Sequence, residues 1–347
     1  MRVKATLIGV TAVVLLGSTL AGCSNPAISS SSSSGSGSAS AASAPATVTA
    51  GKLPASCSQA NPPIGVSLPN TVNPYYIAMR QSFLDNGKAD GFNVNVAIAN
   101  DSDSNQLSQV EAFVQQGVCA IALNGVNSGP AAASVAAANK AGIPVFTVNV
   151  TVDPDSLKAQ NASIVQYVGP DQAKGGQQMA QLALSDMGSS TAFVVGIVGD
   201  PDQIPTNERD QGFIDTLKAG ASNVTVLPTV NSKVDPNVSL QVTSDLLQSN
   251  PNINVIFADT GPGAVGAIQA IQQANRGSKV NLYAFCAAST ALTDFYKGCA
   301  AQEPADYAKH VVDSMKSYIG GQPIPTNILL DPTVFKSGQT PGDGEVG

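Results

Sequence analysis

Short apolar runs rich in β-branched residues recur along the chain between residues 64 and 285. In most of these runs the hydrophobic positions are continuous and do not alternate with polar ones, which is typical of strands covered on both faces of a parallel sheet. The predicted strands are residues 64–68, 94–98, 119–123, 145–148, 194–198, 224–227, 255–257 and 282–285.

Segments with helical periodicity lie between these strands and after the last one. Asn73 and Pro74 favour a helix start, because Asn caps a helix well and Pro fits its first turn. Tyr76, Met79 and Phe83 then follow at the spacing of one helix face. The other predicted helices are residues 105–116, 131–141, 171–187, 207–219, 239–248, 263–275, 290–297 and 305–319. The alternation predicts an α/β fold built on parallel sheets with helices on both faces.

The first residues of the chain do not fit this alternation. Arg2 and Lys4 precede an apolar stretch, residues 5–16, which is too short for a stable membrane span and is typical of an export signal. Leu20-Ala21-Gly22-Cys23 then resembles the lipobox of bacterial lipoproteins. We expect residues 1–22 to be a signal peptide and Cys23 to carry the lipid. The mature protein is then exported and held on the outer face of the cell membrane, the periplasmic side in a diderm organism.

Residues 23–51 are expected to form a flexible tether. Residues 24–50 consist mostly of Ser, Ala, Gly and Thr and contain no charged residue, so they bury too little apolar surface to offset the entropy of ordering. Folding is expected to begin near Lys52. The remaining chain is long enough for two lobes with separate cores.

The charge balance excludes nucleic acid as a partner. The formal net charge is −7, and removing Arg2 and Lys4 from the 17 basic residues leaves 15 against 24 acidic ones, a net of −9. No later apolar run approaches the length of a membrane span. Contact with the bilayer is therefore expected through the lipid anchor alone.

Four cysteines remain once Cys23 is set aside: Cys57, Cys119, Cys286 and Cys299. An even number in an exported chain suggests disulfides, with three possible connectivities. The spacing of a zinc site is absent and His310 is the single histidine, so no metal centre is expected. The glycine-rich residues 261–263 lack the Lys-Ser/Thr of a phosphate loop, and no cofactor is expected.

Several motifs follow one another in a characteristic order between residues 63 and 325. They are Gly65-Val66-Ser67, Asn73-Pro74-Tyr75-Tyr76, Ala141-Gly142-Ile143-Pro144-Val145-Phe146, Val168-Gly169-Pro170-Asp171, Glu208-Arg209 with Gly212-Phe213, and Ile256-Phe257-Ala258. Together they resemble the type I periplasmic sugar-binding proteins of bacterial ABC transporters, the group that includes ribose-, galactose- and allose-binding proteins.

This resemblance implies the type I periplasmic-binding-protein fold, in which two doubly wound parallel-sheet lobes are joined by a three-segment hinge and close on a small polar ligand. Lobe 1 would comprise residues 61–169 and 303–325, and lobe 2 residues 170–302 and 326–347. The chain would cross between lobes near residues 169–170, 302–303 and 325–327. Because each pair then lies within one lobe, the disulfides Cys57–Cys119 and Cys286–Cys299 are favoured.

The resemblance also implies a set of ligand-binding residues in the cleft. Arg209 matches a second-lobe arginine that binds sugar hydroxyls, and Gln302 matches a hinge glutamine. Five positions depart from the family pattern. Asn149 and Val150 replace an acidic residue and an arginine, Thr260 replaces an asparagine, Cys286 replaces an aspartate, and Val234 falls where an aromatic residue is usual. The full set is Ser67, Asn73, Tyr75, Tyr76, Asn149, Arg209, Asp259, Thr260, Cys286 and Gln302.

Other roles remain open for several of these residues. The tyrosines could be core aromatics at a helix start, Tyr76 especially, and Arg209 could be an exposed charge on a helix. Cys286 could be bonded to Cys299 or be an inert thiol in the cleft, whereas catalysis with His310 as its base is disfavoured.

The implied function is that of a lipid-anchored, monomeric solute-binding protein that captures a sugar or sugar-like ligand and delivers it to an ABC permease. The loss of charged hydrogen-bonding groups indicates a smaller or less hydroxylated ligand than a hexose, or a ligand held through Asn, Thr and backbone groups. The alternative is a sensor that signals to a membrane kinase or chemoreceptor. An enzyme is not expected, because no serine, metal or paired-carboxylate constellation has a suitable spacing.

Overall fold

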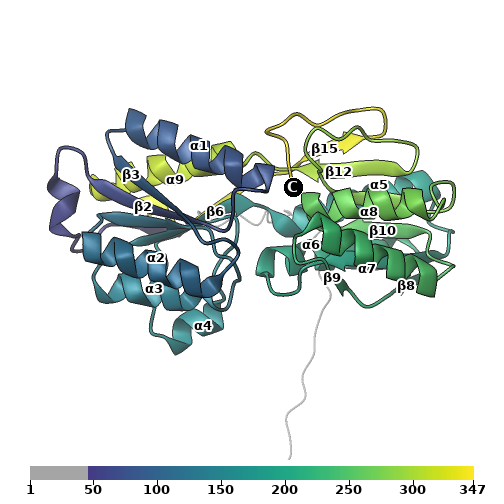
Figure 1. The fold of residues 1–347 in the computed structure, drawn as a ribbon, viewed down its shortest axis with the longest axis horizontal. Coiled ribbons are helices and arrows are strands. Elements are labelled where there is room, and N and C mark those ends of the chain that lie inside the picture. The colour runs from purple at the N-terminus through teal and green to yellow at the C-terminus, as the bar shows by residue number, and fades with distance from the viewer. Residues whose placement is uncertain (1–45) are drawn as a thin grey trace, which may run out of the picture. The chain divides into compact units, whose positions relative to one another are not determined.

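The computed structural model describes residues 46–347 (Figure 1). The expected signal peptide and Cys23 lie outside the described residues, so both stay predictions. Within the described part of the chain, no helix is long and apolar enough to cross a membrane. The strands form two main parallel sheets, each in its own lobe, together with a short two-stranded pairing.

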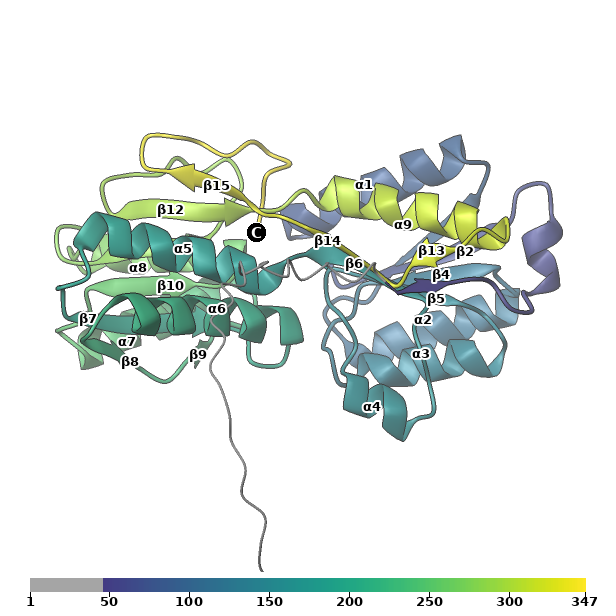
Figure 2. The same ribbon diagram turned by 180° about the vertical axis from the view of Figure 1, so that it is seen from behind.

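The first lobe is built on a six-stranded sheet in the order β14-β6-β5-β4-β2-β3, in which every neighbouring pair is parallel. Helices α1 and α9 lie on one face and α2 and α3 on the other (Figures 1 and 2). The strands are β2 (Pro63–Leu68), β3 (Asn93–Ile98), β4 (Ala120–Leu123), β5 (Val145–Val148), β6 (Gln166–Pro170) and β14 (Asn327–Leu330). The helices are α1 (Pro74–Ala89), α2 (Asp103–Gln116), α3 (Ala131–Lys140), α4 (Pro154–Ala159) and α9 (Pro304–Ile319).

The second lobe is built on the order β15-β12-β11-β10-β7-β8, with β9 also paired to β7. Only β15 runs antiparallel to its neighbour within this described sheet. The strands are β7 (Phe193–Gly199), β8 (Val224–Val226), β9 (Val230–Asn231), β10 (Val255–Ala258), β11 (Asn281–Phe285), β12 (Tyr296–Ala301) and β15 (Thr333–Lys336). Helices α5 (Gln172–Met187) and α6 (Ile204–Gly220) cover one face, and α7 (Pro236–Ser249) and α8 (Gly261–Gln273) cover the other.

The chain passes between the two sheets three times, as predicted, but the third crossing is displaced. The first two lie between β6 and α5 and between β12 and α9, at the expected positions. The third lies at residues 331–332, between β14 and β15, and not at residues 325–327. The sequence boundary is wrong because β14 extends the first sheet beside β6 before the chain crosses.

Two further expectations are corrected by strand pairing. Residues 46–51 are not part of a free tether, because β1 (Thr47–Val48) pairs antiparallel with β13 (Ile324–Pro325) and Val48 packs on the first core. Residues 290–297 do not form a helix, because β12 begins at Tyr296 and pairs with β11. In both places pairing with another strand overrides the local pattern.

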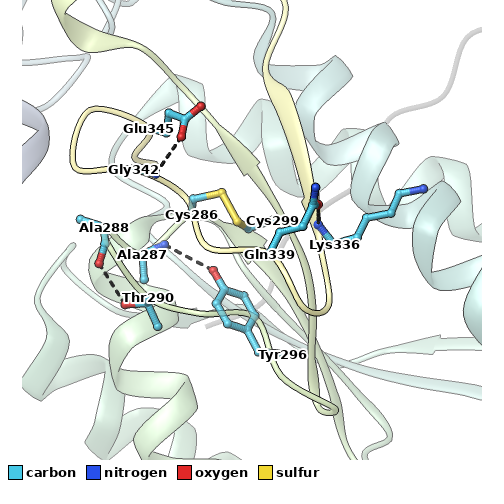
Figure 3. The surroundings of a disulfide bond; sticks show 10 residues. All are labelled: Cys286, Ala287, Ala288, Thr290, Tyr296, Cys299, Lys336, Gln339, Gly342 and Glu345. Carbon is cyan, nitrogen blue, oxygen red and sulfur yellow. Dashed lines mark hydrogen bonds between the residues drawn. A yellow bond between two sulfur atoms is a disulfide. The ribbon is translucent and has the colours of Figure 1, made fainter.

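Both favoured disulfides are present in the structure. Cys57, in the 3₁₀ turn η1 (Ala55–Ser58), is bonded to Cys119 just before β4. Cys286, directly after β11, is bonded to Cys299 in β12, beside the loop that carries Gly342 and Glu345 (Figure 3). The bond excludes the alternative of a free Cys286 thiol in the cleft.

Candidate functional site

A small cavity lies where residues from both lobes meet, at the carboxyl ends of strands and the starts of helices. Its volume is about 20 Å³, which is room for about one water molecule. Ligands of open α/β sheets commonly bind at this kind of edge. This inner cavity is lined by Asn73, Tyr75, Tyr76, Asn149, Gln203, Pro205, Arg209, Val234, Thr260, Gln302 and Gly347.

Most of the residues predicted for ligand binding meet around this cavity. The seven that line it are Asn73, Tyr75, Tyr76, Asn149, Arg209, Thr260 and Gln302. The other three, Ser67, Asp259 and Cys286, are fully buried and are not among the lining residues.

The three residues outside the lining have other partners. The Ser67 hydroxyl donates a hydrogen bond to Gln109 Oε1 at 2.9 Å, inside the first lobe. Cys286 is held in its disulfide. Asp259 lies behind Arg209 and accepts a hydrogen bond from the Asp200 N–H on its Oδ2 at 3.1 Å. Any influence of these side chains on a ligand in the inner cavity is therefore indirect.

The tyrosine pair is positioned by the start of α1. Asn73 caps the helix, with its Oδ1 accepting a hydrogen bond from the Tyr75 N–H at 3.0 Å, and Pro74 occupies the first turn. The two tyrosine rings meet edge to face with their centroids 5.4 Å apart. Both rings are part of a hydrophobic core of the first lobe, and both line the inner cavity. Their core role and their place in the cavity lining are therefore compatible.

Arg209 reaches the cavity from α6 and is only 4% exposed, so it is not a surface charge. Its Nε donates to Gln172 Oε1 at 2.6 Å and its Nη1 donates to the Asp259 carbonyl at 2.7 Å. Burial lowers its pKa and the negative charge of Asp259 opposes that change, so the guanidinium stays cationic. Within the described residues these bonds use two of its five N–H donors, which leaves three for a ligand.

Two amide side chains supply further hydrogen-bonding atoms. Asn149 Oδ1 and Gln302 Nε2 are buried and have no hydrogen-bond partner among the described residues. The Gln302 Oε1 accepts from the Tyr75 hydroxyl at 3.2 Å. Asn149 has a left-handed backbone with φ of 58°, a conformation that Asn tolerates well. Because a buried polar atom without a partner is costly, these two atoms are suited to bind a polar solute.

A pair of carboxyl groups lies behind the arginine. Asp210 and Asp259 both approach Gly199, and one oxygen of each, Oδ1, is buried without a partner among the described residues. Burial raises the pKa of both groups, and the charge of Asp259 raises that of Asp210 further, while Arg209 lowers both. Two close buried carboxyls favour one shared proton over two charges.

Three lining residues were missed by the sequence prediction: Gln203, Pro205 and Gly347. Gln203 follows β7 and its Nε2 donates to the Val126 carbonyl of the other lobe at 3.1 Å. Its place after a predicted strand was a usable signal. Gly347 donates to the Cys286 carbonyl and accepts from the Gly261 N–H. No local pattern indicates that contact, because it depends on the path of residues 337–347.

The lining combines amide, hydroxyl and guanidinium groups, which can hydrogen-bond to a polar molecule. Arg209 is the one charged side chain among the lining residues. Within residues 46–347 no group of three or more His, Cys, Asp or Glu side chains is placed to hold a metal ion.

Comparison with known proteins agrees with this geometry. A family model described as periplasmic binding protein domain matches residues 64–323. The ribose import binding protein of Bacillus subtilis is 29% identical over 213 residues, which cover 61% of this chain and 66% of that protein. The chain thus spans just under two thirds of the length of that relative. The D-allose-binding periplasmic protein of Escherichia coli is 26% identical over 221 residues, which cover 62% of this chain and 70% of that protein.

Solved structures show the same fold. An ABC transporter solute-binding protein of Actinobacillus succinogenes with bound D-allose has a TM-score of 0.72 and 25% identity, and covers 80% of this chain and 98% of its own. A Caulobacter myo-inositol binding protein has a TM-score of 0.72 and 24% identity, and covers 80% of this chain and 93% of its own.

Proposed function

Because the chain belongs to the periplasmic binding protein domain family, we propose that it captures a sugar or sugar-like solute between its lobes and delivers it to the permease of an ABC importer. The observation that carries this proposal is the convergence on one cavity of three polar groups from different parts of the chain. These are the free donors of Arg209 in the second lobe, Asn149 Oδ1 in the first lobe and Gln302 Nε2 at a hinge segment.

The proposed action is binding without bond making or breaking. A solute that hydrogen-bonds to both lobes stabilises the arrangement in which they are close, so ligand and closure favour each other. Direct hydrogen bonds also join the lobes, such as that from the Ile204 N–H to Ser128 Oγ at 2.9 Å. Since the inner cavity holds about one water molecule, the lobes must separate before a sugar ring can enter.

The site favours neutral hydroxylated solutes over charged ones. Relatives are named for ribose and allose, and a structural neighbour for myo-inositol. All three solutes are uncharged and present several hydroxyl groups. Arg209 has three N–H donors left for hydroxyl oxygens, and Asn149 Oδ1 can accept hydrogen bonds from hydroxyl groups.

The export signal and the lipid anchor are part of the proposal. Cys23 would hold the mature protein at the membrane, and the segment before Ala46 would let it reach its permease. Mass spectrometry of the mature amino terminus tests this: a diacylated residue 23 is expected, and Cys23→Ser should release the protein from the membrane fraction. A mature protein that keeps residues 1–22 would contradict it.

The decisive experiment is a titration of the purified mature protein with ribose, D-allose and myo-inositol, followed by calorimetry and by small-angle X-ray scattering. Binding with a fall in the radius of gyration is expected for at least one of them. Tight binding with an unchanged radius would overturn the closure mechanism. Absence of binding to these and to a wider panel of pentoses, hexoses and polyols would overturn the proposed solute class.

A further inference from the structure

A second and larger cavity adjoins the inner one. Its volume is about 460 Å³, within the range of sites that hold small organic molecules. Asn73, Val234 and Gly347 line both cavities, so the two spaces are neighbours at the same cleft. This outer cavity is lined from both lobes, by residues that include the starts of α1, α7 and α8.

The lining of the outer cavity is largely apolar. Its apolar side chains come from both sides of the cleft, and Val72 among them is 83% exposed. They are Val72, Pro74, Val234, Pro236, Pro262, Val265, Ala288 and Val346. This character contrasts with the inner cavity, where amide, hydroxyl and guanidinium groups dominate.

The charges around the outer cavity disfavour an anion. Asp101 and Asp235 are its charged side chains, and no lysine, arginine or histidine is among its lining residues. The helix starts do not compensate, because Asp235 Oδ1 already accepts from the Asn237 and Val238 N–H groups of α7 and Thr260 Oγ1 from the Gly263 N–H of α8. A phosphate or carboxylate in this space would meet like charge and occupied donors.

Val234 provides an independent sign that this junction is functional. It has a left-handed backbone with φ of 52°, which is rare for a β-branched residue. Its N–H is held by Ser232 Oγ at 3.2 Å, so the loop enforces the conformation. Such strain concentrates where side-chain placement matters for binding. Here it places an apolar side chain at the border of the two cavities.

We propose that the solute has two parts: a hydroxylated ring that contacts the inner cavity, and an uncharged apolar substituent that lies in the outer cavity. An alkyl or aryl glycoside fits this description, whereas a sugar phosphate does not. The inference rests on the proposed function and deepens it, because it names the class of solute that the same cleft selects.

The test compares matched methyl and phenyl glycosides of ribose and of allose by isothermal titration calorimetry on the mature protein. The phenyl glycoside of the sugar that binds should bind about tenfold more tightly than its methyl counterpart, because the ring removes apolar surface from water. The 5-phosphate of ribose should bind more weakly than ribose. Equal or weaker binding of the phenyl glycosides, with the free sugar still bound, overturns the inference and leaves the proposed function standing. Failure of these compounds together with myo-inositol and the wider panel of pentoses, hexoses and polyols overturns both.

Two variants test whether the tighter binding of the phenyl glycoside arises in the outer cavity. Ala288→Phe places a ring in the outer cavity and should remove the preference for the phenyl glycoside while the methyl glycoside still binds. Val72→Ser should reduce the preference several-fold, and the variant should fold normally because Val72 is exposed. Ile77→Ser is the matched control, because Ile77 is also an exposed apolar residue of the α1 region but lines neither cavity. An equal effect of Val72→Ser and Ile77→Ser would contradict the assignment.

Discussion

The guanidinium carbon of Arg209 lies 3.9 Å from the centre of the Phe285 ring. The same side chain is hydrogen-bonded to Gln172 and to the Asp259 carbonyl. Stacking and hydrogen bonding together fix the plane of the guanidinium. Because less freedom is then lost on binding, this arrangement favours affinity for a ligand that matches the remaining donors.

Arg209→Lys tests this preorganisation. Lysine keeps the charge but loses the planar fork, so it cannot maintain both hydrogen bonds and the stacking. We expect a loss of solute affinity of about 100-fold, or about 2–3 kcal/mol, and a fall of about 1–2 kcal/mol in the free energy of unfolding. Calorimetry and urea denaturation measure the two effects. Arg80→Lys, at an exposed position in α1, is the control and should change neither.

Tyr75→Phe tests the bond between α1 and the hinge. The Tyr75 hydroxyl donates to Gln302 Oε1, and its removal leaves that buried oxygen without its donor. We expect the free energy of unfolding to fall by about 1 kcal/mol and solute affinity to fall several-fold, because Gln302 loses its orientation. Tyr283→Phe, which removes a hydroxyl bonded to Asp186 within the second lobe, should lower stability without a change in affinity. Equal affinities for Tyr75→Phe and the wild type would contradict a role for this bond in the site.

Gly176→Ala tests the close packing of α5 on α6. A Cβ atom at Gly176 would lie 2.0 Å from the Arg209 carbonyl oxygen and 2.8 Å from the Phe213 nitrogen, both backbone atoms of α6. The helices must move apart, so we expect a loss of about 1–3 kcal/mol in the free energy of unfolding together with weaker solute binding, since Arg209 moves with α6. Gly344→Ala, where a Cβ meets nothing within 4 Å, is the control. A variant as stable as this control would show that the two helices adjust freely.

Much of the fold was predictable because continuous apolar runs and helix caps are local signals. The apolar runs predicted as strands at residues 64–68, 119–123 and 145–148 correspond to β2, β4 and β5. Asn73 caps α1, as its position before Pro74 predicted. The errors fall where the structure is decided by pairing with another strand. β1 is held by β13, β12 by β11, and β14 by β6, and no local pattern in these segments identifies the partner.

The candidate site likewise contains residues that the local sequence predicts and residues whose orientation it does not predict. Residues at strand ends and helix starts, such as Asn149 and Thr260, were expected at the cleft edge because parallel strands end on one side of a sheet, and both line the inner cavity. Ser67 also ends a strand, but its side chain turns inward to Gln109. Which way a side chain points at a strand end depends on packing, and the sequence pattern does not contain that information.

The two disulfides should contribute unequally to stability. Cys57–Cys119 joins residues 62 positions apart, whereas Cys286–Cys299 joins residues 13 apart. A longer loop loses more entropy in the unfolded chain when it is closed. We expect the double variant Cys57→Ser, Cys119→Ser to be less stable than Cys286→Ser, Cys299→Ser by about 1 kcal/mol in urea denaturation. The reverse order would indicate that the shorter bond acts mainly through the folded state, by holding the loop beside the cleft.

Asp210→Asn should change how stability depends on pH. Burial and the neighbouring Asp259 raise the pKa of Asp210 in the folded protein above its unfolded value. Between those two pKa values the folded state binds more protons than the unfolded state, so the free energy of unfolding falls as pH rises through that window. Asparagine stays neutral and can donate to the Asp259 carboxylate, so the variant should be more stable than the wild type by about 1–3 kcal/mol at pH 8.5, with a smaller difference at pH 5.

Thermal and urea denaturation across this pH range measure the effect. Asp215→Asn, on the exposed side of the same helix, is the control and should follow the wild-type profile. If Asp210→Asn instead lowers stability equally at both pH values, the carboxyl of Asp210 is charged and stabilising in the folded protein. In that case the carboxyl groups of Asp210 and Asp259 would not hold a proton between them. In the expected case, the wild type loses part of its stability on the alkaline side because Asp210 and Asp259 come to carry two negative charges against the single positive charge of Arg209.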